Sequence, residues 1–104
     1  MRNAALAASK GFDFIISPTA PMPTYPAEWA SPVNDPQRPF EHIAFTVAMN
    51  MSEQPAISIN CGYTSTGLPI GLQIFGQRFD DLGVLRLAKA YEEMRPVQKP
   101  WPVL

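Results

Sequence analysis

Two short segments joined by a turn-rich loop constrain this fold most strongly. Residues Ala56–Cys61 alternate apolar and polar side chains, and residues Pro69–Phe75 form a second strand-like run. The loop Gly62–Leu68 between them is rich in turn-forming residues. Alternation has the period of a β-strand, and turn formers between two such strands favour a hairpin. The sequence therefore predicts an antiparallel hairpin with a longer loop.

Three helices are expected around this hairpin. The alanine-rich residues Asn3–Lys10 favour a first helix because alanine has the highest helix propensity. Apolar side chains repeating every three or four residues predict a second helix over Phe40–Met51. A final helix is expected from Asp80 or from Asp81 to Met94, with an aspartate as its N-terminal cap.

A strand and a proline-rich loop complete the chain. The nearly continuous apolar run Phe12–Ser17 fits a strand buried on both faces. Residues Pro18–Pro39 hold most of the 12 prolines without any periodicity, which predicts an irregular loop over the surface. The element order predicts an α/β fold with a partial mixed sheet, made of one strand plus an antiparallel hairpin, and three helices. Residues 1–104 are too few for more than one small domain.

Composition and charge exclude several classes of function. The net charge is −1 and no basic cluster occurs, so no nucleic-acid or membrane partner is expected. The single cysteine, Cys61, excludes an internal disulfide, and no metal-ligand cluster or cofactor motif is present. No apolar stretch is long enough to span a bilayer or to act as a secretion signal. A reducing, cytoplasmic setting is therefore expected.

Three sequence blocks resemble the C-terminal end of the amidase-signature family, in the family's order and spacing. They are Asp13–Pro21 with its Ser-Pro-Thr-Ala-Pro turn, Phe45–Ile59, and Gly67–Gly76 followed by a helix with two aspartates at its start. The resemblance covers nearly the whole chain. It implies an α/β fold in which helices cover a large central sheet. It also implies hydrolysis of a small carboxylic amide to an acid plus ammonia or amine, through a serine acyl-enzyme and without a metal or cofactor.

The catalytic groups that this resemblance implies are absent from the chain. Family members use a serine nucleophile, a second serine, a lysine and a glycine/serine-rich segment that stabilises the oxyanion. This sequence has no Gly-Gly and no Ser-Ser, and its three lysines do not match the catalytic lysine. No catalytic residue is assigned. The catalytic half is expected N-terminal to residue 1 in a longer parent, and the isolated chain is expected to be inactive.

The resemblance nevertheless points to residues near a substrate. Family equivalents of the turn with Thr19 and of the helix with Thr46 and Asn50 approach the substrate pocket, so these three are candidate substrate-binding residues. Glutamine-using members carry an acidic residue just before the threonine matched by Thr46. Residues 42–44 are His, Ile and Ala here. This favours a generic amidase with a less polar pocket over a component of an aminoacyl-tRNA amidotransferase.

A small independent hydrolase is a weaker alternative. His42 with Cys61, or Ser17 alone, could supply a nucleophile. Unpaired cysteines in strands are more often inert small hydrophobes, and a serine before a proline is more often a turn-capping hydroxyl. His42, Cys61 and Ser17 are therefore not assigned a catalytic role.

Other polar and aromatic residues have structural interpretations. Asp80 and Asp81 are expected to cap a helix rather than to act as an acid–base pair. Asn50 and Gln73 are expected to bond the backbone of a packed interior. Tryptophans 29 and 101 lie in proline-rich loops, where they would either mark an interface or cover the core.

Self-association is the remaining expectation. If the Phe12–Ser17 strand is separated from the rest of its sheet, one apolar face and one hydrogen-bonding edge lie open, and open edges pair with other chains. The partner is then a second copy or the missing N-terminal part. A non-catalytic, self-associating or binding module derived from an amidase is thus the alternative to an amidase segment.

Overall fold

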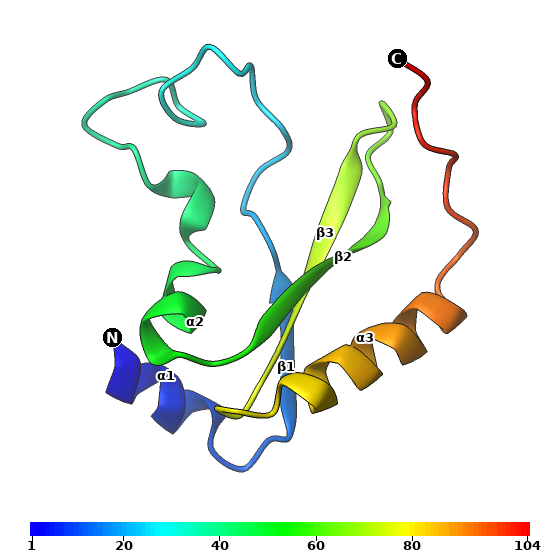
Figure 1. Ribbon diagram of the computed structural model, residues 1–104. Coiled ribbons are helices and arrows are strands. Elements are labelled where there is room, and N and C mark those ends of the chain that lie inside the picture. The colour runs from blue at the N-terminus through cyan, green and yellow to red at the C-terminus, as the bar shows by residue number, and fades with distance from the viewer.

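The computed structural model describes residues 1–104 and contains a three-stranded sheet with helices on both faces (Figure 1). The strands are β1 (Phe14–Pro18), β2 (Ala56–Tyr63) and β3 (Pro69–Gly76), in the order β1-β3-β2. The helices are α1 (Arg2–Ser9), α2 (Val47–Ser52) and α3 (Asp81–Met94), with a 3₁₀ turn η1 (Glu41–Ile43). One strand plus a hairpin with three helices is confirmed, and both strand pairings are antiparallel. The molecule is flat, with extents of 39 × 39 × 21 Å.

The two faces of the central strand β3 carry different groups at its middle. In register, Ile74 lies opposite Ile16 on β1 and Ile57 on β2, whereas the preceding residue Gln73 lies opposite two serines. Successive side chains of a strand point to opposite faces, so the isoleucines share one face. Helix α3 covers this face, and its Ala88 joins Ile59 and Ile74 in the buried cluster. The hydrophobic core therefore lies between α3 and the hairpin.

A buried polar network holds α1 and α2 at the end of β3. Gln54 is only 5% exposed, and its side-chain amide donates to the Gly76 carbonyl at 2.9 Å and to Ser9 Oγ at 3.2 Å. Ser52 Oγ donates to Gln54 Oε1 at 2.9 Å. Because buried polar groups require partners, this network fixes where the two helices meet the sheet.

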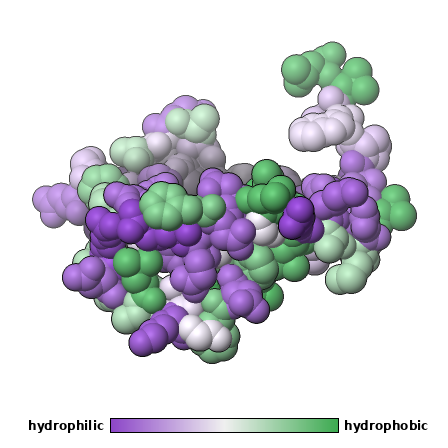
Figure 2. All heavy atoms as spheres, turned by 60° about the horizontal axis from the view of Figure 1, so that its bottom comes forward, coloured by the Kyte–Doolittle hydropathy of each residue, from purple (hydrophilic) through white to green (hydrophobic).

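The last helix begins and ends as the sequence predicts. Asp80 caps α3 by accepting a hydrogen bond from the Gly83 amide at 3.1 Å, which confirms its structural role. After the helix, an extended tail runs beside the hairpin, where the Lys99 amide donates to the Tyr63 hydroxyl at 3.1 Å. The tail then leaves the body and ends in exposed apolar residues (Figure 2). No helix of the chain has the length and apolar character needed to cross a membrane.

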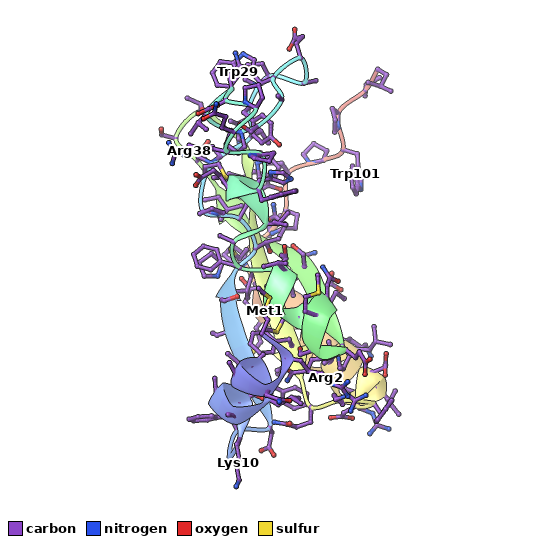
Figure 3. The ribbon with its side chains drawn as sticks, turned by 90° about the vertical axis from the view of Figure 1, so that its left-hand side faces the viewer. Met1, Arg2, Lys10, Trp29, Arg38 and Trp101 are labelled. Carbon is purple, nitrogen blue, oxygen red and sulfur yellow. The ribbon has the colours of Figure 1, made fainter.

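The two tryptophans lie on the surface of the molecule. Trp101 is 92% exposed and Trp29 is also exposed. Both lie at the end of the molecule opposite Lys10 (Figure 3). Of the two interpretations of these residues, covering the core is wrong for Trp101.

The single helix predicted over Phe40–Met51 is wrong. The segment forms η1, a turn and then the short helix α2. The interruption falls just before α2, at Thr46, whose hydroxyl donates to the Ile43 carbonyl at 3.3 Å. The apolar periodicity also fails to bury its residues, since Phe40 is 69% exposed and Met51 is exposed as well.

The first strand is not buried on both faces within this chain, as expected for a strand separated from the rest of its sheet. The strand exists as β1, but its Ile16 side chain is 63% exposed. It lies on the same face of the sheet as α3, which covers the hairpin strands on that face and leaves Ile16 open. Strand β1 hydrogen-bonds only to β3, so its other edge has no partner within the chain. An open edge and an open apolar surface were expected of an isolated chain, and both are observed.

Candidate substrate-binding site

A cavity of about 240 Å³ lies between the α2 segment and the sheet, and Gln73 and Ser58 are among the residues that line it. Its lining comes from the β1 end, from residues 46–54 and from both hairpin strands: Thr19, Thr46, Met49, Asn50, Gln54, Ala56, Ile57, Ser58 and Gln73. Thr19, Thr46 and Asn50, the three candidates from the sequence, thus line one cavity. We refer to it below as the narrow cavity.

Two hydroxyl groups from β2 and the end of β1 meet in the narrow cavity. Thr19 Oγ1 lies 2.7 Å from Ser58 Oγ, across 39 residues of sequence. The pair depends on Gly71 of the central strand, whose carbonyl accepts from the Thr19 amide at 3.0 Å. A Cβ on Gly71 would lie 2.8 Å from Thr19 Oγ1 and 3.0 Å from Ser58 Oγ. Glycine is therefore required at this position for the two hydroxyls to approach.

Gln73 supplies a buried amide whose two ends have different surroundings. The side chain is 3% exposed, and Nε2 donates to Ser17 Oγ and to the Phe45 carbonyl, each at 2.9 Å. A carbonyl only accepts hydrogen bonds, so the Phe45 contact identifies the nitrogen end of the amide. No hydrogen bond within the chain uses Oε1. The predicted structural role is thus confirmed for the nitrogen, while the oxygen is left as an acceptor beside the cavity.

Asn50 and Thr46 differ in how their side chains are held. Asn50 is exposed, so the prediction that it lies in a packed interior is wrong. It nevertheless lines the narrow cavity, and its side-chain amide makes no hydrogen bond inside the chain. Thr46 is half-buried and donates to the Ile43 carbonyl, which orients its hydroxyl oxygen at the start of α2.

A second cavity, of about 480 Å³, adjoins the first. The proline-rich segment 18–25, the loop end of the hairpin and His42 line it, and Thr19 borders both cavities. The Tyr25 and His42 rings lie 6.1 Å apart, tilted by 57°. Nδ1 of His42 is enclosed by the protein and has no hydrogen-bond partner. We refer to this space as the wide cavity.

Neither cavity presents a full charge. No Asp, Glu, Lys or Arg side chain occurs in either lining, and the polar groups are hydroxyls, amides, a phenol and an imidazole. The chain also has no group of three or more His, Cys, Asp or Glu side chains that could hold a metal ion. The two cavities are therefore suited to uncharged ligands that make a few hydrogen bonds.

The nucleophiles considered for an independent hydrolase are placed elsewhere. Ser17 Oγ donates to the Pro18 carbonyl at 3.1 Å and accepts from Gln73, which confirms the turn-capping interpretation. Cys61 is half-buried in β2 and lines neither cavity, whereas His42 lines the wide one. Neither serine nor cysteine is paired with a base.

Sequence reasoning did not identify Ser58 and Gly71 as parts of the site. Ser58 occupies a polar position in the alternating pattern of β2, which shows only that its side chain points away from the apolar core. A glycine inside a strand often marks a close approach of the backbone, and the contact of Gly71 with Thr19 is such an approach. What the sequence could not show is which segment comes close, because that depends on the pairing of β1 with β3.

Comparison with known proteins identifies the family. A family model described as Amidase matches residues 1–85. The chain belongs to the amidase family. In this family member, the narrow and wide cavities lie within segments 13–21, 45–59 and 67–76 or close to them.

Similar proteins include both a hydrolase and components of an amidotransferase. A glutamyl-tRNA(Gln) amidotransferase subunit of Thermodesulfovibrio yellowstonii is 44% identical over 92 residues, which are 88% of this chain and 19% of that protein. The crystal structure of the corresponding subunit from Thermotoga maritima has a TM-score of 0.69 at 33% identity, covering 93% of this chain and 20% of that one. The structure of 6-aminohexanoate cyclic dimer hydrolase has a TM-score of 0.68 at 31% identity, covering 89% and 21%.

The chain therefore spans about a fifth of the length of these relatives. The relatives from Thermodesulfovibrio and Thermotoga are amidotransferase subunits, which weighs against the preference for a generic amidase drawn from residues 42–44. Similarity to both kinds of protein gives the family and not the substrate.

Proposed function

We propose that this chain forms one wall of the substrate pocket in an enzyme that hydrolyses a carboxylic amide to an acid and ammonia or an amine. The narrow cavity carries the proposal, because residues from three separate segments line it and offer neutral hydrogen-bonding groups. A small concave site with a few convergent polar groups is the usual form of a substrate pocket. In this proposal the serine acyl-enzyme forms on groups outside residues 1–104.

The groups inside the narrow cavity support a role in binding the amide, with the reaction itself carried out by groups outside residues 1–104. A serine or threonine hydroxyl becomes a nucleophile when an adjacent base removes its proton. Thr19 and Ser58 bond to each other, and no histidine, lysine or carboxylate occurs in this lining. The hydroxyls can therefore orient an amide but have no means of attacking it. The isolated chain is expected to bind amides without turning them over.

A chimera tests the proposal. The matching fifth of 6-aminohexanoate cyclic dimer hydrolase would be replaced by this chain, and hydrolysis of the cyclic dimer would be measured. We expect measurable turnover by the chimera, none by the isolated chain, and a lower kcat/KM when Ser58→Ala and Thr19→Val remove the hydroxyl pair. A chimera that folds, as judged by circular dichroism and a cooperative melt, yet hydrolyses nothing would refute the proposal. Unchanged kcat/KM in both variants would refute the role of the cavity.

A self-associating module is the second candidate, and the open edge of β1 favours it. The strand pairs on one side only, and its Ile16 side chain is exposed. Unpaired strand edges template pairing with another chain. We expect the isolated chain to form homo-oligomers in light scattering coupled to size-exclusion chromatography. A monodisperse 11.5 kDa monomer would rule this candidate out.

A further inference from the structure

We propose that the substrate is an uncharged carboxamide held by Gln73 Oε1 and the Thr19–Ser58 hydroxyls, with a cyclic, apolar acyl group extending past Thr19 into the wide cavity. This inference rests on the proposed function, because it assumes that the narrow cavity receives the amide. It adds the class of substrate and assigns Gln73 as a residue that contacts it.

The acceptor for the amide N–H is the oxygen of Gln73. Two hydrogen bonds hold its nitrogen end, so the side chain cannot turn its oxygen away from the cavity. Oε1 has no partner in the chain, yet it is not among the fully enclosed polar atoms that lack one. The space that it reaches is therefore the narrow cavity, which Gln73 lines. A fixed, buried acceptor suits a ligand with an N–H donor.

The matching donor is the hydroxyl pair. When two hydroxyls bond to each other, one hydrogen lies between them and the second remains available. Ser58 lies directly opposite Gln73 in the β2–β3 register, so donor and acceptor are cross-strand neighbours on the same face. A neutral carboxamide, with an N–H and a carbonyl on one carbon, complements this arrangement. A carboxylate would place a negative charge beside Gln73 Oε1 without a cation to balance it.

The lining of the wide cavity indicates which kind of acyl group the substrate carries. Four prolines contribute to its lining, together with the Tyr25 and His42 rings, whose centroids lie 6.1 Å apart. These rigid, flat groups favour an aromatic or alicyclic ring over a flexible chain. Since neither lining carries a full charge, free glutamine would leave its ammonium and carboxylate desolvated and unpaired.

A titration followed by NMR on the whole ¹³C,¹⁵N-labelled chain tests this inference. The probes are benzamide, cyclohexanecarboxamide, propionamide, benzoate and glutamine. We expect both cyclic amides to shift the Gln73 side-chain NH₂ signal and the Tyr25 and His42 ring signals. Propionamide should shift only the narrow-cavity signals, and benzoate and glutamine should shift neither set.

The outcomes separate this inference from the proposed function. If no amide shifts the narrow-cavity signals, the proposed pocket itself is wrong. If propionamide shifts them but the cyclic amides never affect Tyr25 or His42, the pocket stands and the wide-cavity assignment falls. Binding of glutamine or benzoate as strong as that of benzamide would overturn the restriction to uncharged ligands.

A matched pair of variants in the proline-rich loop adds a second test. Ala20 lines the wide cavity, whereas Ala27 is exposed in the same loop and lines neither cavity. Ala20→Phe should weaken benzamide binding by at least about tenfold, the scale on which a hydrophobic pocket discriminates ligand size, and leave propionamide binding unchanged. Ala27→Phe should change neither. Equal benzamide affinity in all three proteins would overturn the assignment of the acyl group.

Discussion

Gly71→Ala is the most direct test of how the site is built. The backbone of Gly71 has no left-handed φ, so alanine meets no conformational obstacle there. Its new methyl would lie 2.8 Å from Thr19 Oγ1 and 3.0 Å from both Thr19 Cβ and Ser58 Oγ. Rotating the Thr19 side chain cannot relieve the contact with Cβ, and the Thr19 amide is bonded to the Gly71 carbonyl. We therefore expect the end of β1 to shift and the hydroxyl pair to separate.

The expected loss of stability is modest because opposing effects contribute. Overpacking costs about 1–3 kcal/mol. Loss of the exposed hydroxyl bond costs about 0.5 kcal/mol, the low end for hydrogen bonds. Replacing a strand glycine by alanine returns about 0.5–1 kcal/mol. The free energy of unfolding should thus fall by about 0.5–3 kcal/mol, which lowers Tm by roughly 2–24 °C in a chain of this size.

A double-mutant cycle completes this test. Urea unfolding is followed by circular dichroism at one protein concentration, because self-association would shift the transition. Thr19→Gly removes two of the three crowded atoms, so it should cost less in the Gly71→Ala background than in the native chain, with a coupling of about 1 kcal/mol. A Gly71→Ala protein as stable as the native chain, or strictly additive effects, would show that β1 does not approach β3 in this way.

Substitutions at three further positions test other parts of the fold. Gln54→Leu should lower the free energy of unfolding by about 2–3 kcal/mol, because the Gly76 carbonyl and the Ser52 hydroxyl lose a buried partner; a loss below about 0.5 kcal/mol in urea unfolding would contradict the network. Asp80→Ala should cost about 1 kcal/mol and Asp80→Asn much less, since asparagine still caps a helix; equal costs in thermal melts would contradict the cap. Ile16→Lys should shift oligomers toward monomer in light scattering, and an unchanged mass would place the interface elsewhere.

The hairpin and α3 could be predicted from the sequence because their signals are local. Alternation with turn formers indicates β2 and β3, and an aspartate before an amphipathic run indicates the start of α3. Strand β2 extends two residues beyond Cys61 because Asn60 bonds both backbone groups of Gly62, forming a bulge where the register shifts. Sequence periodicity carries no information about such a bulge.

The prediction of a single helix over Phe40–Met51 was wrong for a physical reason. Its apolar spacing fits a helix, but a stable helix of this kind needs a surface on which to bury that stripe. Thr46, Met49 and Asn50 of this segment instead line the narrow cavity. Phe40 and Met51 remain exposed. Burial of these exposed apolar residues would require a surface outside residues 1–104. The apolar spacing therefore indicates burial that this chain alone does not provide.

The candidate site follows from one feature of topology, the central position of β3. Because β3 lies between the other two strands, Gln73 faces Ser17 on one side and Ser58 on the other. Two residues away, Gly71 lets Thr19 reach Ser58 across the central strand. If β1 had paired with β2 instead, Gln73 would be separated from Ser17, and its amide would lack the partner that orients its oxygen. The residue types could be recognised in the sequence, whereas their meeting depends on a strand order that no local pattern encodes.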